Sequence, residues 1–94
     1  MKFTMELQDN MDIYNNIGKV FRHFKGDLYL LIDIGIHSET EEEMVIYKAL
    51  YGEYRTYVRP LNMFISEVDK NKYPNIAQRY RFQIIEINSV KNNM

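Results

Sequence analysis

The chain has 94 residues, of which 46% are hydrophobic and 14% aromatic, and its formal net charge at pH 7 is −1. This length and composition predict one folded domain with a single small core, and the small net charge excludes a general electrostatic attraction to nucleic acid or to an anionic membrane. Cysteine is absent, which excludes disulfides, thiol catalysis and thiolate metal sites. The N-terminus has no continuous apolar region like that of a signal peptide, and no segment approaches the roughly 18 apolar residues that a membrane helix needs. We therefore expect a soluble, cytoplasmic protein without a membrane partner.

The N-terminal residues alternate between apolar and polar side chains. Residues 1–8 follow the period of two that is typical of a half-buried strand, and residues 9–16 are rich in Asn and Asp, which favours a turn. We therefore expect a single domain over 1–94, made of an N-terminal extension (1–17, a strand plus a turn), a core (18–88) and a frayed tail (89–94).

The middle of the chain predicts a series of short strands joined by turns. Residues 19–24 read as a strand that ends in a turn at Gly26, and residues 28–37 form the most apolar strand pattern of the chain. After a turn at 38–42, residues 43–51 are expected to return antiparallel. A register that pairs His37 with Glu43 places Ile34 opposite Ile46 on the core side. The expected core face of the 28–37 strand consists of Leu28, Leu30, Ile32, Ile34 and Ile36.

The opposite face of this hairpin carries a different set of side chains. In the same register, Tyr29 lies opposite Tyr51 and Asp33 lies opposite Tyr47, with His37 further along the strand. Tyrosine is amphipathic and is enriched at protein interfaces. We therefore predict a tyrosine-lined face that contains an acid and a histidine.

The C-terminal half predicts one further hairpin, a helix and a last strand. Residues 54–59 read as a strand after a tight turn at Gly52, and Pro60 stops the ladder and begins a short helix over 60–67. Met63 and Phe64 would dock this helix on the barrel. Residues 79–88 are the last expected strand. The pattern predicts a mainly β fold: a small SH3-like β-barrel or roll of five or six antiparallel strands with one short helix near Pro60.

Several short motifs occur in a fixed order along the chain. These motifs are His23-Phe24-Lys25-Gly26, His37-Ser38-Glu39-Thr40, Leu50-Tyr51-Gly52, Arg59-Pro60, Met63-Phe64 and Tyr80-Arg81-Phe82. In this order and spacing they resemble the bacterial family known as domain of unknown function 1653, from about residue 18 to residue 82. The resemblance implies a small SH3-type β-barrel or roll, and it implies no established activity.

One set of candidate functional residues is centred on His37. Adjacent strand residues point to opposite faces, so His37 cannot readily activate Ser38, and a hairpin turn explains the Ser-Glu-Thr sequence better than catalysis does. Asp33 and His37 share a face but lie about 13 Å apart, at roughly 3.3 Å per residue. A ligand could span them beside Tyr47 and Tyr51, which leaves a small enzyme or ligand-processing domain using His37 and Asp33 as an alternative. The opposing interpretation is that these tyrosines pack beneath the N-terminal segment.

A second set is basic. His23 and Lys25 both point away from Phe24, and with Arg59 they could form a corner that binds a carboxylate or a phosphate. Equally, Arg59 could pair with Glu39 or Asp33 in a purely structural role.

Metal and nucleic-acid sites find less support. The acids at 39–43 lack the glycine of a calcium loop, and two histidines without cysteine do not suit zinc. In the 79–82 segment the alternation puts arginines and aromatics on opposite faces, so single-stranded nucleic-acid binding is a second, weaker alternative.

We predict no cofactor and no metal. The expected function is a non-enzymatic binding or interaction module for an unknown protein or small molecule, with a homodimer plausible. Its candidate contact residues are His23, Lys25, Tyr29, Asp33, His37, Tyr47, Tyr51 and Arg59.

Overall fold

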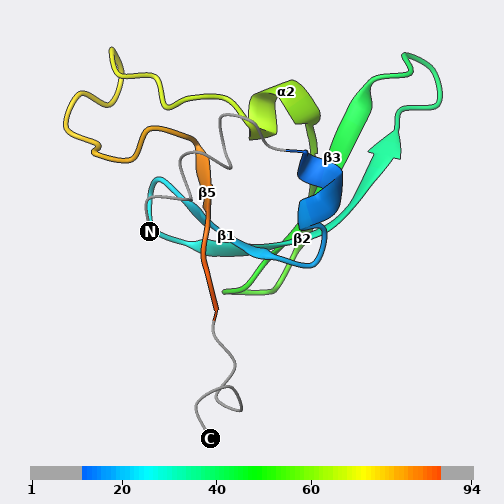
Figure 1. Ribbon diagram of the computed structural model, residues 1–94, viewed down its shortest axis with the longest axis horizontal. Helices are drawn as coiled ribbons and strands as arrows, with labels where there is room; N and C mark the ends of the chain where they lie inside the picture. Colours follow the sequence, from blue (N-terminus) through cyan, green and yellow to red (C-terminus); the bar gives the residue numbers. More distant parts are fainter. Residues whose placement is uncertain (1–11, 88–94) are drawn as a thin grey trace, which may run out of the picture.

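The computed structural model describes residues 12–87, which form a mainly β structure (Figure 1). Five antiparallel strands make one sheet in the order β4-β3-β2-β1-β5. The elements are η1 (Ile13–Asn16), β1 (Val20–His23), β2 (Leu28–Ile36), β3 (Glu43–Ala49), β4 (Thr56–Pro60), α2 (Leu61–Phe64) and β5 (Phe82–Ile84). The predicted mainly β class, the five strands and the short helix after Pro60 are confirmed, and closure of the sheet into a barrel remains a prediction.

Three predicted elements lie toward the ends of the chain. The expected strand at 1–8 and the expected tail at 89–94 lie outside the described residues. The last strand was expected over 79–88, but β5 covers only Phe82–Ile84. The shortening has a local cause: the residues before β5 belong to the connection from α2, where Tyr80 forms an isolated antiparallel bridge with Glu67.

The predicted register of the β2–β3 hairpin is wrong. Ile34 pairs with Val45 rather than Ile46, and a β-bulge between Leu31 and Asp33 shifts the register by one further residue, so that Leu31 pairs with Tyr47. Because side chains alternate across a strand, such a bulge changes which face each residue occupies. Leu31 and Ile34 both pack on the core as a result.

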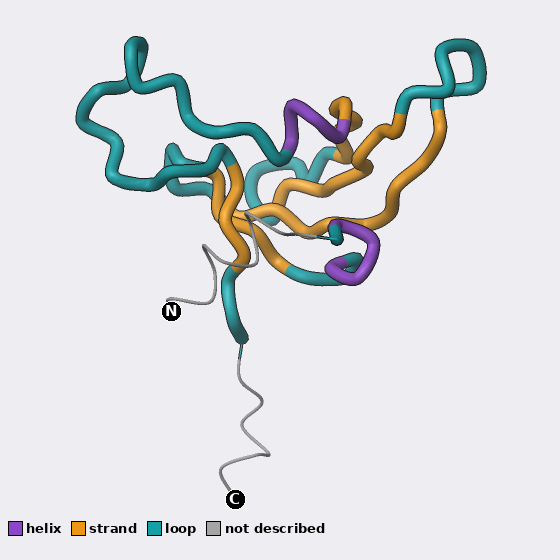
Figure 2. The backbone as a smooth tube through the Cα atoms, turned by 45° about the horizontal axis from the view of Figure 1, so that its top comes forward, coloured by secondary structure: helices purple, strands orange, loops and turns teal. Residues whose placement is uncertain are grey.

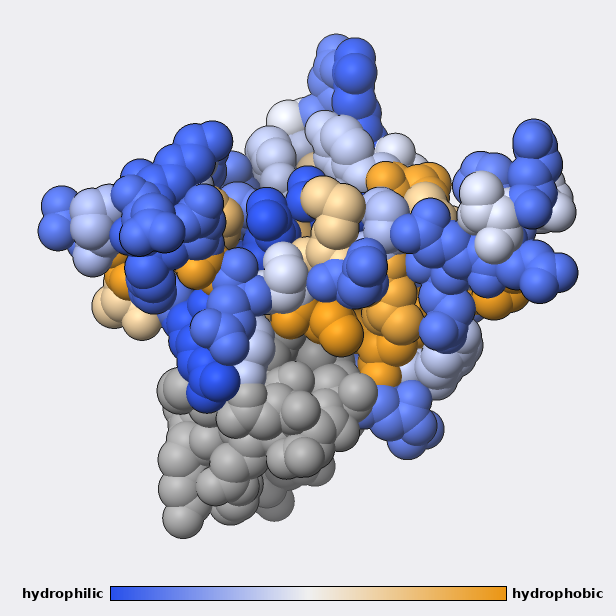
Figure 3. All heavy atoms as spheres, turned by 90° about the horizontal axis from the view of Figure 1, so that it is seen from above, coloured by the Kyte–Doolittle hydropathy of each residue, from blue (hydrophilic) through white to orange (hydrophobic). Residues whose placement is uncertain are grey.

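The expected aliphatic core face is therefore largely on the outside. Ile36 is 60% exposed, and Leu28 and Ile32 are also exposed, whereas Leu31 is fully buried. Figure 3 shows hydrophobic residues gathered in the middle of one face, between hydrophilic projections on either side.

Aromatic side chains fill the core instead. Tyr47 is 4% exposed, and Tyr29 packs against the same cluster. A tyrosine can be buried in this way because its hydroxyl reaches a polar partner at the edge of the core: the Tyr29 and Tyr51 hydroxyl oxygens are 2.6 Å apart. The tyrosine-lined face is thus mostly interior. The buried hydrophobic residues of the central cluster are Ile13, Phe21, Leu31, Val45, Tyr47, Phe64, Phe82 and Ile84.

Helix α2 closes this core mainly through Phe64, with Leu61 packed against the same cluster. Phe64 is fully buried and stacks on Phe82, with ring centroids 4.2 Å apart and planes 9° apart. Phe21 and Tyr47 meet Phe64 edge-on. The predicted docking of Phe64 is confirmed, but Met63 is 46% exposed and does not dock, since a four-residue helix presents a single side to the sheet.

The connection from α2 to β5 projects far from the sheet (Figure 2). Inside it, the Lys70 ammonium donates hydrogen bonds to the carbonyl oxygens of Ile76 and Gln78. The Gln78 side-chain amide in turn donates to the carbonyl oxygens of Arg22 and Tyr80. These bonds shape the 69–79 loop and tie it to β1, so the loop forms one wall of the site described next.

Candidate functional site: a basic pocket

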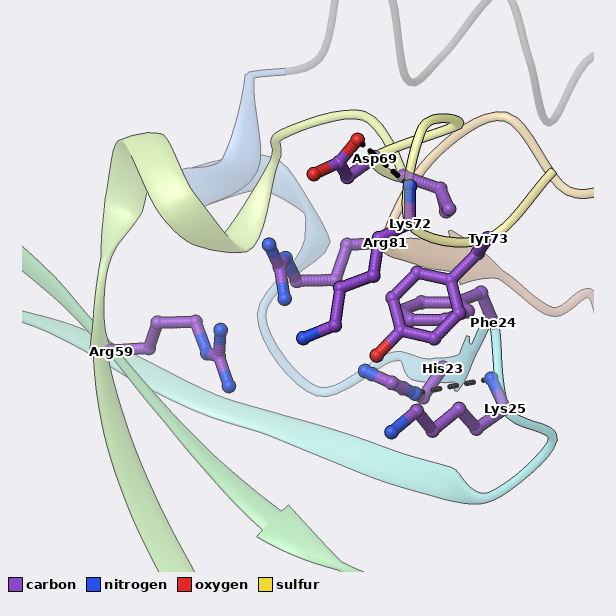
Figure 4. A pocket seen from close by; sticks show the side chains of 9 residues that line it. His23, Phe24, Lys25, Arg59, Asp69, Lys72, Tyr73 and Arg81 are labelled. Carbon is purple, nitrogen blue, oxygen red and sulfur yellow. Dashed lines mark hydrogen bonds between the residues drawn. The ribbon is translucent and has the colours of Figure 1, made fainter. Parts of the chain in front are cut away.

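A pocket of about 350 Å³ lies between the sheet and the 69–79 loop (Figure 4). Its walls come from four places in the chain: the end of β1 with the turn that follows, β4, the 68–73 segment, and the residue before β5. The lining residues are His23, Phe24, Lys25, Arg59, Val68, Asp69, Lys72, Tyr73 and Arg81. Four Lys or Arg side chains thus share the pocket with one carboxylate.

Arg59 is held in the pocket by the core. Its Nε donates a hydrogen bond of 3.1 Å to the hydroxyl of Tyr47, and its guanidinium lies 5.9 Å from the centre of the Phe82 ring. Within residues 12–87 no carboxylate forms an ion pair with Arg59. Both terminal amino groups therefore keep their donors for another partner, because a guanidinium carries five N–H groups.

Arg81 is arranged in the same way. Its Nε donates to the Ser66 hydroxyl at 3.2 Å, and Arg81 is only partly exposed. Ser66 Oγ itself donates a hydrogen bond to the carbonyl oxygen of Met63 at the end of α2. This bond holds in place the hydroxyl that accepts from Arg81. In the part of the chain that the structure describes, no carboxylate pairs with Arg81 either.

His23 supplies a neutral donor. Its Nδ1 accepts the backbone N–H of Lys25 at 3.1 Å, so the neutral ring carries its proton on Nε2. The ring also packs edge-on against Phe82 at 5.0 Å. Burial, followed by the charges of Arg59 and Arg81, lowers the pKa of His23 to about 4. His23 is therefore uncharged at neutral pH.

We expect His23 to make the stability of the fold fall as the pH is lowered. In the unfolded chain His23 has a pKa near 6.5, against about 4 in the fold. Between these values the unfolded state binds a proton that the folded state does not, so the free energy of unfolding decreases from pH 6.5 toward pH 4. Urea titrations across this range should show a weaker decrease for His23→Gln than for the unchanged protein.

The same prediction can be checked directly on the imidazole ring. The chain has two histidines, so His37→Gln leaves one histidine signal in a proton NMR spectrum. That signal should titrate near pH 4. A midpoint near 6.5 would show that the burial and the neighbouring cations do not act on His23.

The 69–79 loop brings the fourth cation and a tyrosine. The ammonium groups of Lys25 and Lys72 each lie 5.5 Å from the centre of the Tyr73 ring. Burial acts to raise the pKa of Tyr73, but the two lysine charges outweigh it, and the pKa is lowered. Asp69 Oδ1 accepts the backbone N–H groups of Asn71 and Lys72, so this carboxylate caps its own turn.

The structure brings three of the predicted site residues together. His23, Lys25 and Arg59 all line the pocket, as the predicted basic corner requires. Arg59 pairs with neither Asp33 nor Glu39 among the described residues; its Nε donates to the Tyr47 hydroxyl instead.

The other predicted residues lie elsewhere. Tyr47 is a core residue and Tyr29 packs against the core, while Tyr51 contacts Tyr29 at the edge. Asp33 is exposed on β2 and accepts the backbone N–H of Ile34 at 2.8 Å. His37 sits in the hairpin turn, where its Nδ1 accepts the N–H groups of two following residues. The bulge in β2 separates Asp33 from the tyrosines, so a joint site of Asp33, His37, Tyr47 and Tyr51 does not form.

The comparisons with known proteins agree with this architecture. Residues 19–84 match the family described as "Protein of unknown function (DUF1653)". The chain belongs to this family. A crystal structure of a DUF1653 protein from Bordetella bronchiseptica is similar to this DUF1653 domain, with a TM-score of 0.61 and 29% identity over 77% of this chain and 90% of that chain. None of the curated proteins compared matches it.

Several features of the DUF1653 domain bear on other types of site. Within residues 12–87 there is no group of three or more His, Cys, Asp or Glu that could hold a metal ion, and no helix in that range is long and apolar enough to cross a membrane. Tyr80 and Phe82 are buried, so they present no stacking surface to a nucleic acid. Arg79 pairs with Glu67 at 3.2 Å, while Arg81 turns into the pocket.

Sequence reasoning missed six of the nine pocket residues of the DUF1653 domain: Phe24, Val68, Asp69, Lys72, Tyr73 and Arg81. Arg81 was expected in solvent because it alternates with Tyr80 and Phe82. Lys72 and Tyr73 carry no signal in the sequence that links them to His23, since only the fold of the 69–79 loop places them there. Phe24 contacts Tyr73 at 4.9 Å between ring centroids.

Proposed function

We propose that this DUF1653 domain is a non-enzymatic binding module and that the basic pocket is its ligand site, with a small anionic molecule as the ligand. The observation that carries the proposal is the state of Arg59 and Arg81. Both are partly buried, both are held at Nε by a hydroxyl, and neither pairs with a carboxylate among the described residues.

The argument is energetic. Removing a cation from water costs free energy that an ion pair would normally offset. Here the partners are neutral hydroxyls, which orient each guanidinium without neutralising its charge. Lys25 and Lys72 add charge of the same sign to the same pocket. Such an arrangement weakens the fold unless an anion enters, which favours a binding role over a structural one.

The non-enzymatic part of the proposal rests on how the titratable groups are used. His23 Nδ1 accepts a backbone N–H, and Asp69 Oδ1 accepts two more. Neither group is paired with a hydroxyl nucleophile among the described residues. The pocket therefore has donors that hold a charge, and it lacks the base-and-nucleophile pair on which acyl transfer depends.

The test is binding of simple anions by NMR. We expect inorganic phosphate, added at low ionic strength, to shift the amide signals of pocket residues. The double variant Lys25→Gln, Lys72→Gln should bind at least about tenfold more weakly, because it loses two charge-assisted contacts. Both lysines are exposed, so folding should be retained.

The matched control is Lys19→Gln with Lys48→Gln. It makes the same change in net charge at two lysines that do not line the pocket. It should bind phosphate as the unchanged protein does. If both double variants weaken phosphate binding equally, the effect comes from the overall charge of the protein. If phosphate shifts no amide signal, the proposed site is refuted.

A further inference from the structure

We infer that the ligand of the basic pocket carries a phosphate monoester, a tetrahedral group with two negative charges, on a small organic molecule. The inference rests on the proposed function, because it names the ligand class of the same site.

The first argument is the charge of the pocket. Its lining contains Lys25, Arg59, Lys72 and Arg81, against the single carboxylate of Asp69. The hydrogen bond from the Lys25 N–H to His23 Nδ1 favours the neutral imidazole. The excess is thus three positive charges. One carboxylate or one phosphate diester would leave two of them uncompensated in a partly enclosed space, whereas a dianion leaves one.

The second argument is the direction of the donors. Figure 4 shows cationic groups reaching the pocket from opposite sides: Arg59 from β4, Lys25 from the turn after β1, and Lys72 from the 69–79 loop. A carboxylate accepts hydrogen bonds close to one plane. The three terminal oxygens of a phosphate monoester point in three directions, so they match donors that converge from several walls.

The third argument concerns the two guanidinium groups. Because Tyr47 and Ser66 occupy Nε of Arg59 and Arg81, each arginine keeps its two terminal amino groups for a ligand. Paired N–H donors on a rigid plane bind two oxygens of one phosphate at once. The hydroxyls hold each plane in place before a ligand arrives, which reduces the entropy lost on binding.

The fourth argument concerns the size and chemistry of the organic part that carries the phosphate. A volume of about 350 Å³ lies at the small end of the range for ligand sites. The aromatic rings of the wall already have partners: Tyr73 contacts Phe24, and His23 contacts both Phe24 and Phe82. These rings pack against one another, and the volume is small, so a short polar molecule fits better than a nucleotide or a single strand.

The experiment compares methyl phosphate, dimethyl phosphate and acetate by NMR titration at neutral pH. Methyl phosphate and dimethyl phosphate share the tetrahedral centre and differ by one charge. We expect methyl phosphate to bind at least about tenfold more tightly than either monoanion, since each charge-assisted contact contributes about that factor. The Lys25→Gln, Lys72→Gln variant should reduce this preference.

A pH series gives a second readout. A phosphate monoester gains its second charge with a pKa near 6, so the affinity for methyl phosphate should rise between about pH 5 and pH 7. Sulfate is doubly charged across this range, and its affinity reports any change in the protein itself. We expect the sulfate affinity to stay nearly constant.

The outcomes separate the two proposals. If all three ligands bind equally at the pocket and all weaken in the lysine variant, the anion site stands and the phosphate monoester inference is overturned. If sulfate and methyl phosphate both fail to shift any signal, the inference fails together with the proposed function. A preference for dimethyl phosphate would also overturn the inference and would favour a nucleic-acid backbone.

Discussion

Replacing Phe64 with alanine is expected to lower the free energy of unfolding by about 3–5 kcal/mol, the range for removing a buried phenylalanine. Phe64 is fully buried and contacts Phe21, Tyr47 and Phe82 through its ring. Domains of this size have roughly 5–14 kcal/mol in total, so the loss is a large share. Urea unfolding followed by circular dichroism measures it.

Two comparison variants keep this prediction testable if Phe64→Ala does not fold. Phe64→Leu retains much of the apolar volume and should cost about 1–2 kcal/mol. Met63→Ala changes a large apolar residue on the same short helix, but Met63 is 46% exposed, so a cost within about 0.5 kcal/mol is expected. Similar losses for Met63→Ala and Phe64→Ala would contradict the asymmetric docking of α2.

Replacing Arg59 with methionine should abolish most anion binding while the protein stays folded. Removing a paired, charge-assisted contact weakens binding by about 10- to 100-fold. Stability should change little, because Arg59 has no ionic partner among the described residues and methionine retains the apolar stem. The main loss of stability, about 1 kcal/mol, comes from the Tyr47 hydroxyl, which loses its hydrogen bond of 3.1 Å to Arg59.

Tyr47→Phe separates positioning from charge. It keeps the ring in the core and removes the acceptor that holds Arg59 Nε. We expect phosphate binding to weaken by a few-fold, less than in Arg59→Met, because the charge remains while its orientation is lost. Unfolding of Arg59→Met with unchanged phosphate binding by Tyr47→Phe would instead assign Arg59 a structural role. Isothermal titration calorimetry and thermal unfolding of both variants decide between these outcomes.

The elements of this fold could largely be predicted from local patterns. Gly26 has a φ of 111°, a backbone conformation that a glycine adopts at little cost, and it lies in the turn predicted between β1 and β2. Pro60 precedes α2 as expected. Which side chains of β2 face the core could not be predicted. A bulge between Leu31 and Asp33 shifts the alternation of side chains, and no pattern in the sequence marks it.

In the candidate site, too, some features could be predicted from local sequence and others depended on long-range packing. His23 and Lys25 are close in the sequence, but strand alternation does not explain why both reach the pocket. β1 ends at His23, and in the turn that follows Phe24 lines the same pocket and contacts the His23 ring at 4.4 Å between centroids, so the expectation that both side chains point away from Phe24 is wrong. The association with Arg59 was only one of two equal alternatives, and the choice depended on Tyr47. A strict alternation of core and solvent faces would place Tyr47 on a surface; packing placed its ring inside and left its hydroxyl at the core edge as the acceptor for Arg59.

By itself, the sequence determined the mainly β class, the turns, the short helix and membership of a family, because these depend on residues close together or on motifs in a fixed order. Only the tertiary structure decided which face is the core and which cations meet. Arg59, Lys72 and Arg81 come from three separated segments, and their convergence depends on how the 69–79 loop packs against the sheet. The basic pocket is therefore a product of long-range packing, in which hydroxyls and not carboxylates hold the arginines in place.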